Sequence, residues 1–169
     1  MYPFGHLGFT LAFFHSSSSL REKINTYALA FGALLPDIID KSFGQFIFQH
    51  GRFVGHSIVI GCVTCFTAGI LMALLNKDKR VAPSLLYGWT AHLIEDSGGF
   101  LPWLYPFVQY SFPISTLDPL RALSNPYVLS CEVMGVILLG LLAYRYGYVD
   151  IAKERGLGAL IRILLDDLK

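Results

Sequence analysis

Five apolar segments run along the chain, separated by short polar or proline-containing stretches. The clearest is Ile58 to Leu75, which has 18 residues and no charged side chain. A helix of this length spans roughly 27 Å, close to the thickness of the hydrocarbon core of a bilayer. Gly61, Cys65 and Gly69 recur every four positions, a spacing that lets membrane helices approach closely. We therefore predict a membrane-spanning helix here.

Four other segments share this apolar character but are shorter or interrupted. They are Gly5 to Ser19, Ile24 to Ile39, Val81 to Ile94 and Tyr127 to Tyr144. The first ends in a run of four serines, which favours an interfacial or tilted helix. The stretch from Phe100 to Pro126 carries five prolines and many aromatic residues. It is typical of a loop or broken-helix layer with its rings at headgroup depth.

The C-terminal stretch has a different pattern, with apolar residues at helical spacing opposite polar ones. The apolar residues are Leu157, Leu160, Ile161, Leu164, Leu165 and Leu168, and the polar ones are Arg162, Asp166 and Asp167. Such an amphipathic helix lies on the membrane surface, covers the end of the bundle or pairs with another chain. We predict an all-α fold: an integral membrane bundle of about five apolar helices over residues 1–150, and a C-terminal amphipathic helix over 151–169.

Composition agrees with a membrane protein. Apolar residues make up 54% of the 169 residues, and charged residues make up 15%, against about 25% in ordinary soluble domains. The mean hydropathy is +0.53. The formal charge of +1 gives no general attraction to nucleic acid, and no nucleic-acid-binding motif is present. We therefore expect membrane lipid, and no nucleic acid, as a partner.

Charge asymmetry predicts an orientation if the five segments cross the membrane in turn. One side then receives ten lysines and arginines and the other receives three. The richer side holds Arg21, Lys23, Lys77, Lys79, Arg80, Arg145, Lys153, Arg155, Arg162 and Lys169; the other holds Lys41, Arg52 and Arg121. By the positive-inside rule the richer side is cytoplasmic. This predicts a multi-pass protein of the inner, cytoplasmic membrane.

The same topology brings a set of histidines and acids to the opposite, non-cytoplasmic end. The set is His6, Asp37, Asp40, His56, His92 and Asp96, while His15 falls at the cytoplasmic end. Ionisable side chains beside hydrocarbon are costly unless they pair, face a cavity or bind a ligand. Imidazole and carboxylate are common ligands for zinc and similar divalent metals. We predict a metal site at this end of the bundle.

His92 and Asp96 lie four residues apart on one predicted helix, so their side chains share a face. Gly88 continues that face one turn earlier and would let another helix come close. Glu95, three residues from His92, is an alternative ligand to Asp96. The competing interpretation of His92 and Asp96 is a structural hydrogen-bonded pair.

Asp37 and Asp40 sit at the end of a predicted helix, directly after Pro36. A proline at this point can bend the helix and expose backbone groups. A spacing of three places both acids on adjacent parts of one face. The alternative is a solvated helix end whose charge Lys41 balances.

Arg52 and His56 lie at the start of the best membrane helix. The planar guanidinium of Arg52 can bind a phosphate or a carboxylate. Alternatively, Arg52 pairs with Asp37, Asp40 or a lipid headgroup and anchors the helix.

His6 and Glu132 are each weak signals alone. A single helix histidine such as His6 is more often structural than a ligand. Glu132 lies in the last apolar segment, at the same end of the bundle as the predicted metal site. We expect it either to hydrogen-bond a metal ligand or to form a hydrogen bond between helices.

At these residues the chain resembles the inner-membrane-associated metal-dependent hydrolases, a family with a LexA-binding member. The matching pieces are GHLGFT around His6, GALLPDIID around Asp37, GRFVGHS around Arg52 and His56, and YGWTAHLIED with LPWLYPF around His92 and Asp96. The pattern is distantly similar to the helical zinc-dependent phospholipase C and nuclease group. The resemblance implies metal-ligand roles for His6, Asp37, His56, His92 and Asp96.

The chain departs from that family at two places. In a His-Arg-Gly-x-Thr-His-Ser stretch of the family, Gly51 replaces the first histidine and Gly55 the threonine. A threonine–proline pair expected after the last acid is replaced by Ser97-Gly98-Gly99.

Together these features predict a membrane-bound metal-dependent hydrolase with a divalent metal, for which zinc is favoured. Asp96 or Asp37 would act as ligand or general base, and Arg52 would hold an anionic substrate. The expected substrates are phospholipid or polyprenyl phosphoesters at the interface, and an ester or amide stays open. The rival is a non-enzymatic membrane protein: a metal sensor or transporter, or a structural anchor held by histidine–carboxylate pairs.

Overall fold

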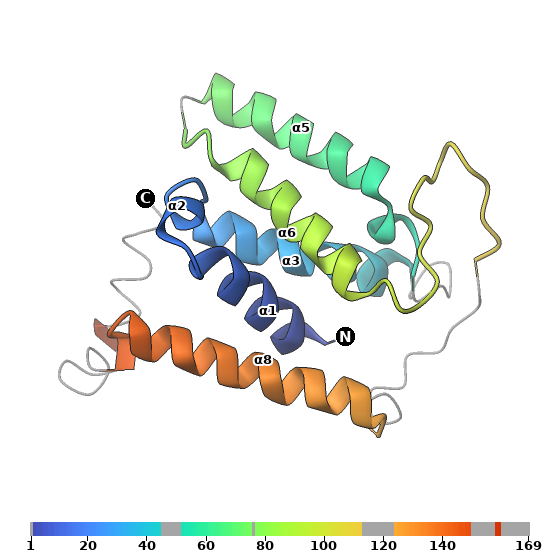
Figure 1. Ribbon diagram of the computed structural model, residues 1–169. Helices are drawn as coiled ribbons and strands as arrows, with labels where there is room; N and C mark the ends of the chain where they lie inside the picture. The colour runs from blue at the N-terminus through green and yellow to red at the C-terminus, as the bar shows by residue number, and fades with distance from the viewer. Residues whose placement is uncertain (1, 45–51, 76, 113–123, 150–157, 160–169) are drawn as a thin grey trace.

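The structure, a computed structural model, describes residues 2–44, 52–75, 77–112, 124–149 and 158–159. The regular elements in these ranges are all helical, as predicted (Figure 1). They are α1 (Pro3–His15), α2 (Ser18–Arg21), α3 (Thr26–Ile39), the π-helical turn η1 (Asp40–Gly44), the 3₁₀ turn η2 (Val54–His56), α5 (Ile58–Leu74), α6 (Val81–Glu95) and α8 (Pro126–Arg145).

Side-chain caps mark the start of three of the five long helices, α3, α5 and α8, and a proline begins α1 and α8. The side chain of Asn25 accepts a hydrogen bond from the N–H of Ala28 at 3.0 Å, and those of Ser57 and Asn125 cap α5 and α8 in the same way. Such caps satisfy N–H groups that the first turn of a helix leaves unpaired. The predicted apolar segments therefore agree with α1, α3, α5, α6 and α8 to within a few residues.

Helix α6 packs between α3 and α5, and α1 packs against α3 and α8 (Figure 1). Glycines allow the closest contacts. A side chain at Gly88 would overlap the backbone of α3 at Leu29, and one at Gly8 would overlap the backbone of α8 at Gly135. The close approach predicted at Gly88 is thus confirmed.

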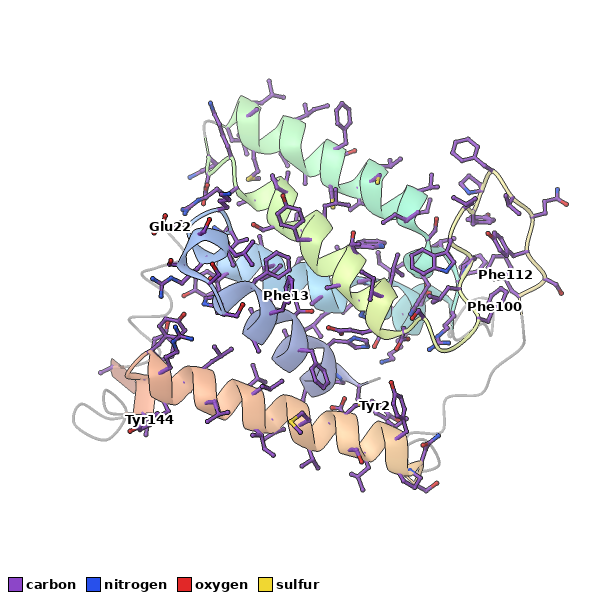
Figure 2. The ribbon with its side chains drawn as sticks, viewed as in Figure 1. Tyr2, Phe13, Glu22, Phe100, Phe112 and Tyr144 are labelled. Atoms are coloured by element: carbon purple, nitrogen blue, oxygen red, sulfur yellow. The ribbon has the colours of Figure 1, made fainter. Side chains whose placement is uncertain are left out.

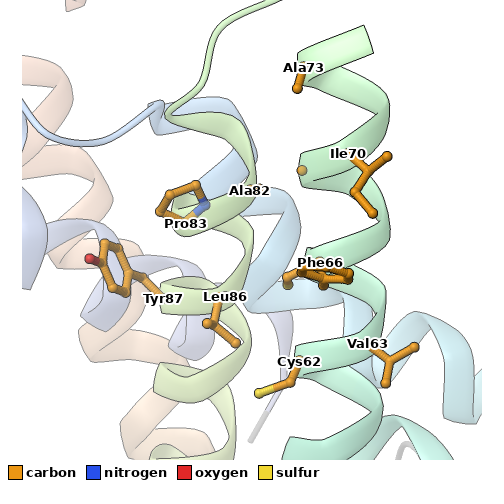
Figure 3. A pocket seen from close by; sticks show the side chains of 11 residues that line it. Cys62, Val63, Phe66, Ile70, Ala73, Ala82, Pro83, Leu86 and Tyr87 are labelled. Atoms are coloured by element: carbon orange, nitrogen blue, oxygen red, sulfur yellow. The ribbon is translucent and has the colours of Figure 1, made fainter.

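The small residues of α5 turn toward α6, as their spacing predicted. A Cβ at Gly61 would meet the indole of Trp89 at 2.7 Å, and Cys65 is buried. On the outer side the two helices leave an apolar groove of about 860 Å³, lined by residues such as Phe66 and Leu86 (Figure 3). Large apolar side chains on this surface suit contact with lipid.

The long helices expose many large apolar side chains, among them Phe13 and Tyr144 (Figure 2). Within the described ranges, α8 is the one helix long and apolar enough to cross a bilayer, and α5 is apolar but has only 17 residues. The all-helical bundle is therefore confirmed, but a bundle of five membrane-spanning helices is not.

An irregular aromatic loop follows α6. Phe100 and Phe112 lie close together in it (Figure 2), with ring centroids 6.1 Å apart. The Ser57 hydroxyl donates to the carbonyl oxygen of Tyr105 at 2.7 Å and ties the loop to the start of α5. Residues 113–123 of the predicted aromatic layer lie outside the described residues. So does the amphipathic helix predicted over 151–169, apart from 158–159.

Replacing Gly88 with leucine should destabilise the protein, because the new side chain would push α6 away from α3. We expect a loss of roughly 1–3 kcal/mol or more in the free energy of unfolding, measured by thermal unfolding in detergent. Gly140→Leu is the matched control, since a side chain at Gly140 meets open space. Equal melting temperatures for Gly88→Leu and the wild type would contradict this packing.

Candidate metal centre

Three histidines from three elements meet at one end of the bundle. His6 lies in the first turns of α1, His56 ends η2, and His92 lies in the last turn of α6. Each side chain is fully buried. The end of the bundle is the one that the topology predicted, whereas His15 lies at the opposite end and contacts Tyr146 and Thr26.

The Nε2 atoms of the three imidazoles face a common centre. Those of His56 and His92 are 3.3 Å apart, and the rings of His6 and His92 stack with centroids 3.9 Å apart. The Nε2 of His6 is buried and has no hydrogen-bond partner in the described part of the chain. A buried polar atom without a partner is rare and calls for an explanation such as a bound ion.

Two carboxylates complete this centre. Asp96 at the end of α6 places Oδ1 3.7 Å from Nε2 of His6 and Oδ2 3.5 Å from Nε2 of His56. Asp37 in the last turn of α3 places Oδ1 3.9 Å from Nε2 of His92 and 4.0 Å from that of His56. The structure therefore brings together all five residues to which the resemblance assigned ligand roles.

The other nitrogen of each imidazole is held from outside the centre. Nδ1 of His92 donates to the carbonyl oxygen of Ala33 at 2.7 Å. Nδ1 of His6 pairs with Glu95 at 2.6 Å, and Nδ1 of His56 pairs with Asp40 at 2.6 Å. Hydrogen bonds of this kind fix the ring and its tautomer, leaving the lone pair of Nε2 for a metal.

Glu95 and Asp40 thus support the candidate ligands. Glu95, predicted as an alternative ligand to Asp96, faces His6 and accepts a hydrogen bond from the hydroxyl of Thr10 at 3.1 Å. Glu95 and Asp96 are neighbours at a helix end, so their side chains point in different directions. The sequence could not show which carboxylate faces the centre.

Asp40 also positions the turn that carries His56. Its buried carboxylate accepts hydrogen bonds from the backbone N–H groups of Phe53 at 2.5 Å and Gly55 at 2.7 Å. A Cβ at Gly55 would lie 2.8 Å from Oδ1 of Asp40 and still closer to the carbonyl oxygen of Pro36. This explains why glycine suits position 55, and it excludes a solvated helix end at Asp40.

Each carboxylate of the centre also pairs with a basic side chain. Arg52 binds Oδ2 of Asp96 at 2.7 Å, and Lys41 binds Oδ2 of Asp37 at 2.6 Å. The alternative prediction that Arg52 pairs with Asp37 or Asp40 is wrong, since its partner is Asp96. A side chain at Gly99 would overlap the guanidinium of Arg52, so Gly99 leaves the space that Arg52 occupies. In the sequence, Gly99 stood out only as part of the Ser97-Gly98-Gly99 departure from the family pattern.

Charge and burial act in opposite directions on two groups at this end. Burial disfavours the charged form of Asp96, but the hydrogen bond with His56 and the charge of Arg52 hold the pKa of that carboxyl well below its usual range. Burial also disfavours protonation of His56, but hydrogen bonds with Asp40 and Asp96 outweigh it and raise the pKa of the imidazole. Asp96 is therefore a carboxylate, the form that binds a cation.

The spacing of the five groups fits a divalent ion. Ligand atoms about 2.0 Å from a tetrahedral zinc ion lie roughly 3.3 Å from one another. Distances of 3.3 to 4.0 Å between the facing atoms are close to this value. Two overlapping trios, His6 with His92 and Asp96, and Asp37 with His56 and His92, each keep their ligand atoms within 4.8 Å. These clusters could hold a metal ion.

Glu132 of α8 anchors the helix that carries His6. Its carboxylate accepts hydrogen bonds from the backbone N–H groups of Tyr2 at 2.8 Å, Phe4 at 3.2 Å and Gly5 at 3.0 Å. A negative charge at a helix N-terminus is favourable because the unpaired N–H groups there carry partial positive charge. Of the two predicted roles, Glu132 makes the contact between helices.

Asp40→Asn should destabilise the protein, because an amide would turn N–H donors toward two backbone N–H groups and His56. We expect a loss of about 1–3 kcal/mol in the free energy of unfolding, measured by thermal unfolding. The exposed Glu22 gives the matched control Glu22→Gln, which should leave the melting temperature unchanged. Equal stability of the two variants would show that Asp40 does not position the turn.

Comparison with known proteins identifies the family. The family model described as the YdjM inner membrane protein matches residues 1–156. No curated protein and no solved structure matches the sequence. The match covers nearly the whole chain. The membrane character of the family agrees with the many large apolar side chains that the helices expose. The chain therefore belongs to the YdjM inner membrane protein family.

Proposed function

We propose that this protein is a multi-pass membrane hydrolase that uses a divalent metal to cleave a phosphoester linked to a lipid. The observation that carries the proposal is the buried Nε2 of His6. It lacks a hydrogen-bond partner in the described residues, yet it lies 3.7 Å from Oδ1 of Asp96 and in one cluster with His92. An ion at this centre would satisfy all of these groups at once.

Zinc is the favoured metal, because imidazole nitrogen and carboxylate oxygen are its usual ligands. His6, Asp37, His56, His92 and Asp96 would hold it. Since Nδ1 of His92 is bound to Ala33, His92 offers a single nitrogen to the two trios that share it, and we place one ion at this shared nitrogen. When bound, the ion supplies Lewis-acid chemistry, which polarises a phosphoryl oxygen and activates water near neutral pH.

Arg52 and Asp96 are the proposed catalytic residues. The guanidinium of Arg52 is partly exposed, at 31%, and carries N–H donors beyond the one that binds Asp96. These donors would hold a phosphoryl oxygen beside the centre. Asp96 reaches both the imidazoles and Arg52, so its carboxylate would either bind the ion or accept a proton from the attacking water.

An apolar groove supports a lipid-linked substrate. It lies between α1 and α6, has a volume of about 630 Å³ and is lined by side chains such as Phe9, Phe14 and Leu86. Its polar end is formed by Thr10 and Glu95, and Glu95 binds His6 of the candidate centre. An acyl or prenyl chain in this groove would bring its headgroup to the end of the bundle where Arg52 lies.

The distribution of basic residues supports an orientation with the site on the non-cytoplasmic side. The end of the bundle opposite the site holds Arg21, Lys23, Lys77, Lys79, Arg80 and Arg145. Arg80 donates to the carbonyl oxygen of Glu22 at 3.5 Å, which brings the start of α6 to the start of α3. By the positive-inside rule this end faces the cytoplasm.

The rival function, a structural anchor or metal sensor without catalysis, is favoured by one observation. Arg52 and Lys41 already pair with both carboxylates of the centre. Such ion pairs could hold the helix ends together without an ion. Metal analysis and a phosphatase assay separate these functions.

Purified wild-type protein should contain about one equivalent of divalent metal per chain, because both trios depend on the single free nitrogen of His92. His92→Ala and Asp96→Ala should lose most of it, as measured by elemental mass spectrometry on samples whose helix content is unchanged. His15→Ala is the control, since His15 lies at the opposite end of the bundle. Metal-free wild type, or equal metal in all four proteins, would favour the structural anchor.

Metal-loaded protein should release phosphate from lipid phosphoesters in mixed micelles. Arg52→Gln should lower kcat/KM roughly 100-fold, the usual cost of removing a donor to the reacting phosphoryl group, while most of the metal stays bound. Arg80→Gln, an exposed arginine at the other end, should leave the rate unchanged. A metal-loaded wild type that cleaves no lipid phosphoester would favour a metal sensor.

A further inference from the structure

A further cavity lies at the basic end of the bundle, away from the candidate metal centre. It has a volume of about 540 Å³ and is enclosed by α1, the α2–α3 region and the end of α8. Its apolar wall is formed by Leu11, Leu139, Leu142 and Ala143. This volume falls in the range of pockets that bind small molecules.

The other wall of this cavity is polar and held in place by a chain of hydrogen bonds. Thr26 contacts Nε2 of His15 at 3.2 Å, and Nδ1 of His15 contacts the hydroxyl of Tyr146 at 3.1 Å. That hydroxyl accepts a hydrogen bond from Arg21 at 3.2 Å. The guanidinium of Arg21 also lies 5.6 Å from the centre of the Tyr146 ring. The arginine is thus oriented before any ligand arrives.

Arg21 has unused capacity for an anion. A guanidinium carries five N–H donors, and Arg21 uses one with Tyr146. No carboxylate in the described ranges lies within ion-pair distance of it. Arg145, the last residue of α8, precedes the lining residue Tyr146 and adds a second positive charge near the cavity. The cavity therefore combines an apolar wall with a cationic rim.

We propose that this cavity binds an anionic glycerophospholipid, with the phosphate on Arg21 and part of an acyl chain against Leu139 and Leu142. Charge complementarity favours this occupant, because basic pockets between helices on the cytoplasmic side bind anionic headgroups. The apolar wall favours a lipid over free phosphate, which would leave that wall unused. His15 is nine residues from His6 on α1, roughly 14 Å along the axis, so this lipid is distinct from a substrate at the metal centre.

Lipid binding to full-length protein in detergent tests the proposal, with native mass spectrometry counting the bound lipids. Phosphatidylglycerol should bind in preference to phosphatidylcholine with the same acyl chains. Arg21→Gln should weaken phosphatidylglycerol binding roughly tenfold, and Tyr146→Phe, which releases Arg21, should weaken it less. Arg80→Gln is the matched control, because Arg80 lies at the same end but pairs with Asp78. It should bind like the wild type.

Several outcomes would overturn the proposal. Equal binding of the two lipids, or an Arg80→Gln variant as weak as Arg21→Gln, would show that the basic end attracts lipid only through its overall charge. Displacement of phosphatidylglycerol by excess glycerol 3-phosphate would show that a soluble phosphate is the ligand. Metal content, measured on the same samples, is expected to be unchanged, so a failure here would leave the proposed hydrolase standing.

Discussion

The candidate centre depends on the hydrogen bonds that three buried imidazoles make through Nδ1, the ring nitrogen that faces away from the centre. Each Nδ1 has a partner on a neighbouring element: Glu95 for His6, Asp40 for His56 and the Ala33 carbonyl for His92. Because buried polar atoms need such partners, these contacts fix the rings and direct every Nε2 to one place. The inner nitrogens are then close together with few donors between them, an arrangement that a cation would stabilise.

Close helix packing makes this convergence possible. His92 can reach the backbone of α3 because Gly88, one turn earlier, lets α6 approach it. Burying imidazoles and acids together is costly, and hydrogen bonds and ion pairs offset much of that cost. The apolar outer surfaces of the same helices suit an inner membrane protein. The bundle is thus apolar outside and polar at one end of its core.

Much of the fold and of the candidate centre could be predicted from the sequence, and there are physical reasons why the other features could not. Apolar runs and caps such as Ser57 locate the helices, and alternating direction alone brings His6, Asp37, His56, His92 and Asp96 to one end. Sequence spacing does not reveal side-chain direction. It therefore could not separate Asp96, which faces the centre, from its neighbour Glu95.

Two features escaped prediction: the contacts of long side chains, and which of the helices are long enough to span a bilayer. The partner of Arg52 depends on the path of the loop after α6, and on the space that Gly99 leaves. The apolar pattern indicated about five membrane helices, with Ile58 to Leu75 as the clearest, whereas α8 is the one described helix that meets the length required to span a bilayer. The short helices pack around buried polar groups, so their apolar runs end early.

Because Glu132 lies late in the sequence, the support of the candidate centre depends on the order in which the chain is synthesised. Glu132 holds the first N–H groups of α1, yet the ribosome makes it after every candidate ligand. A nascent chain that ends before α8 carries the five candidate ligands but lacks the carboxylate that holds the start of α1. A product truncated before α8 would therefore lack this anchor of the helix that carries His6.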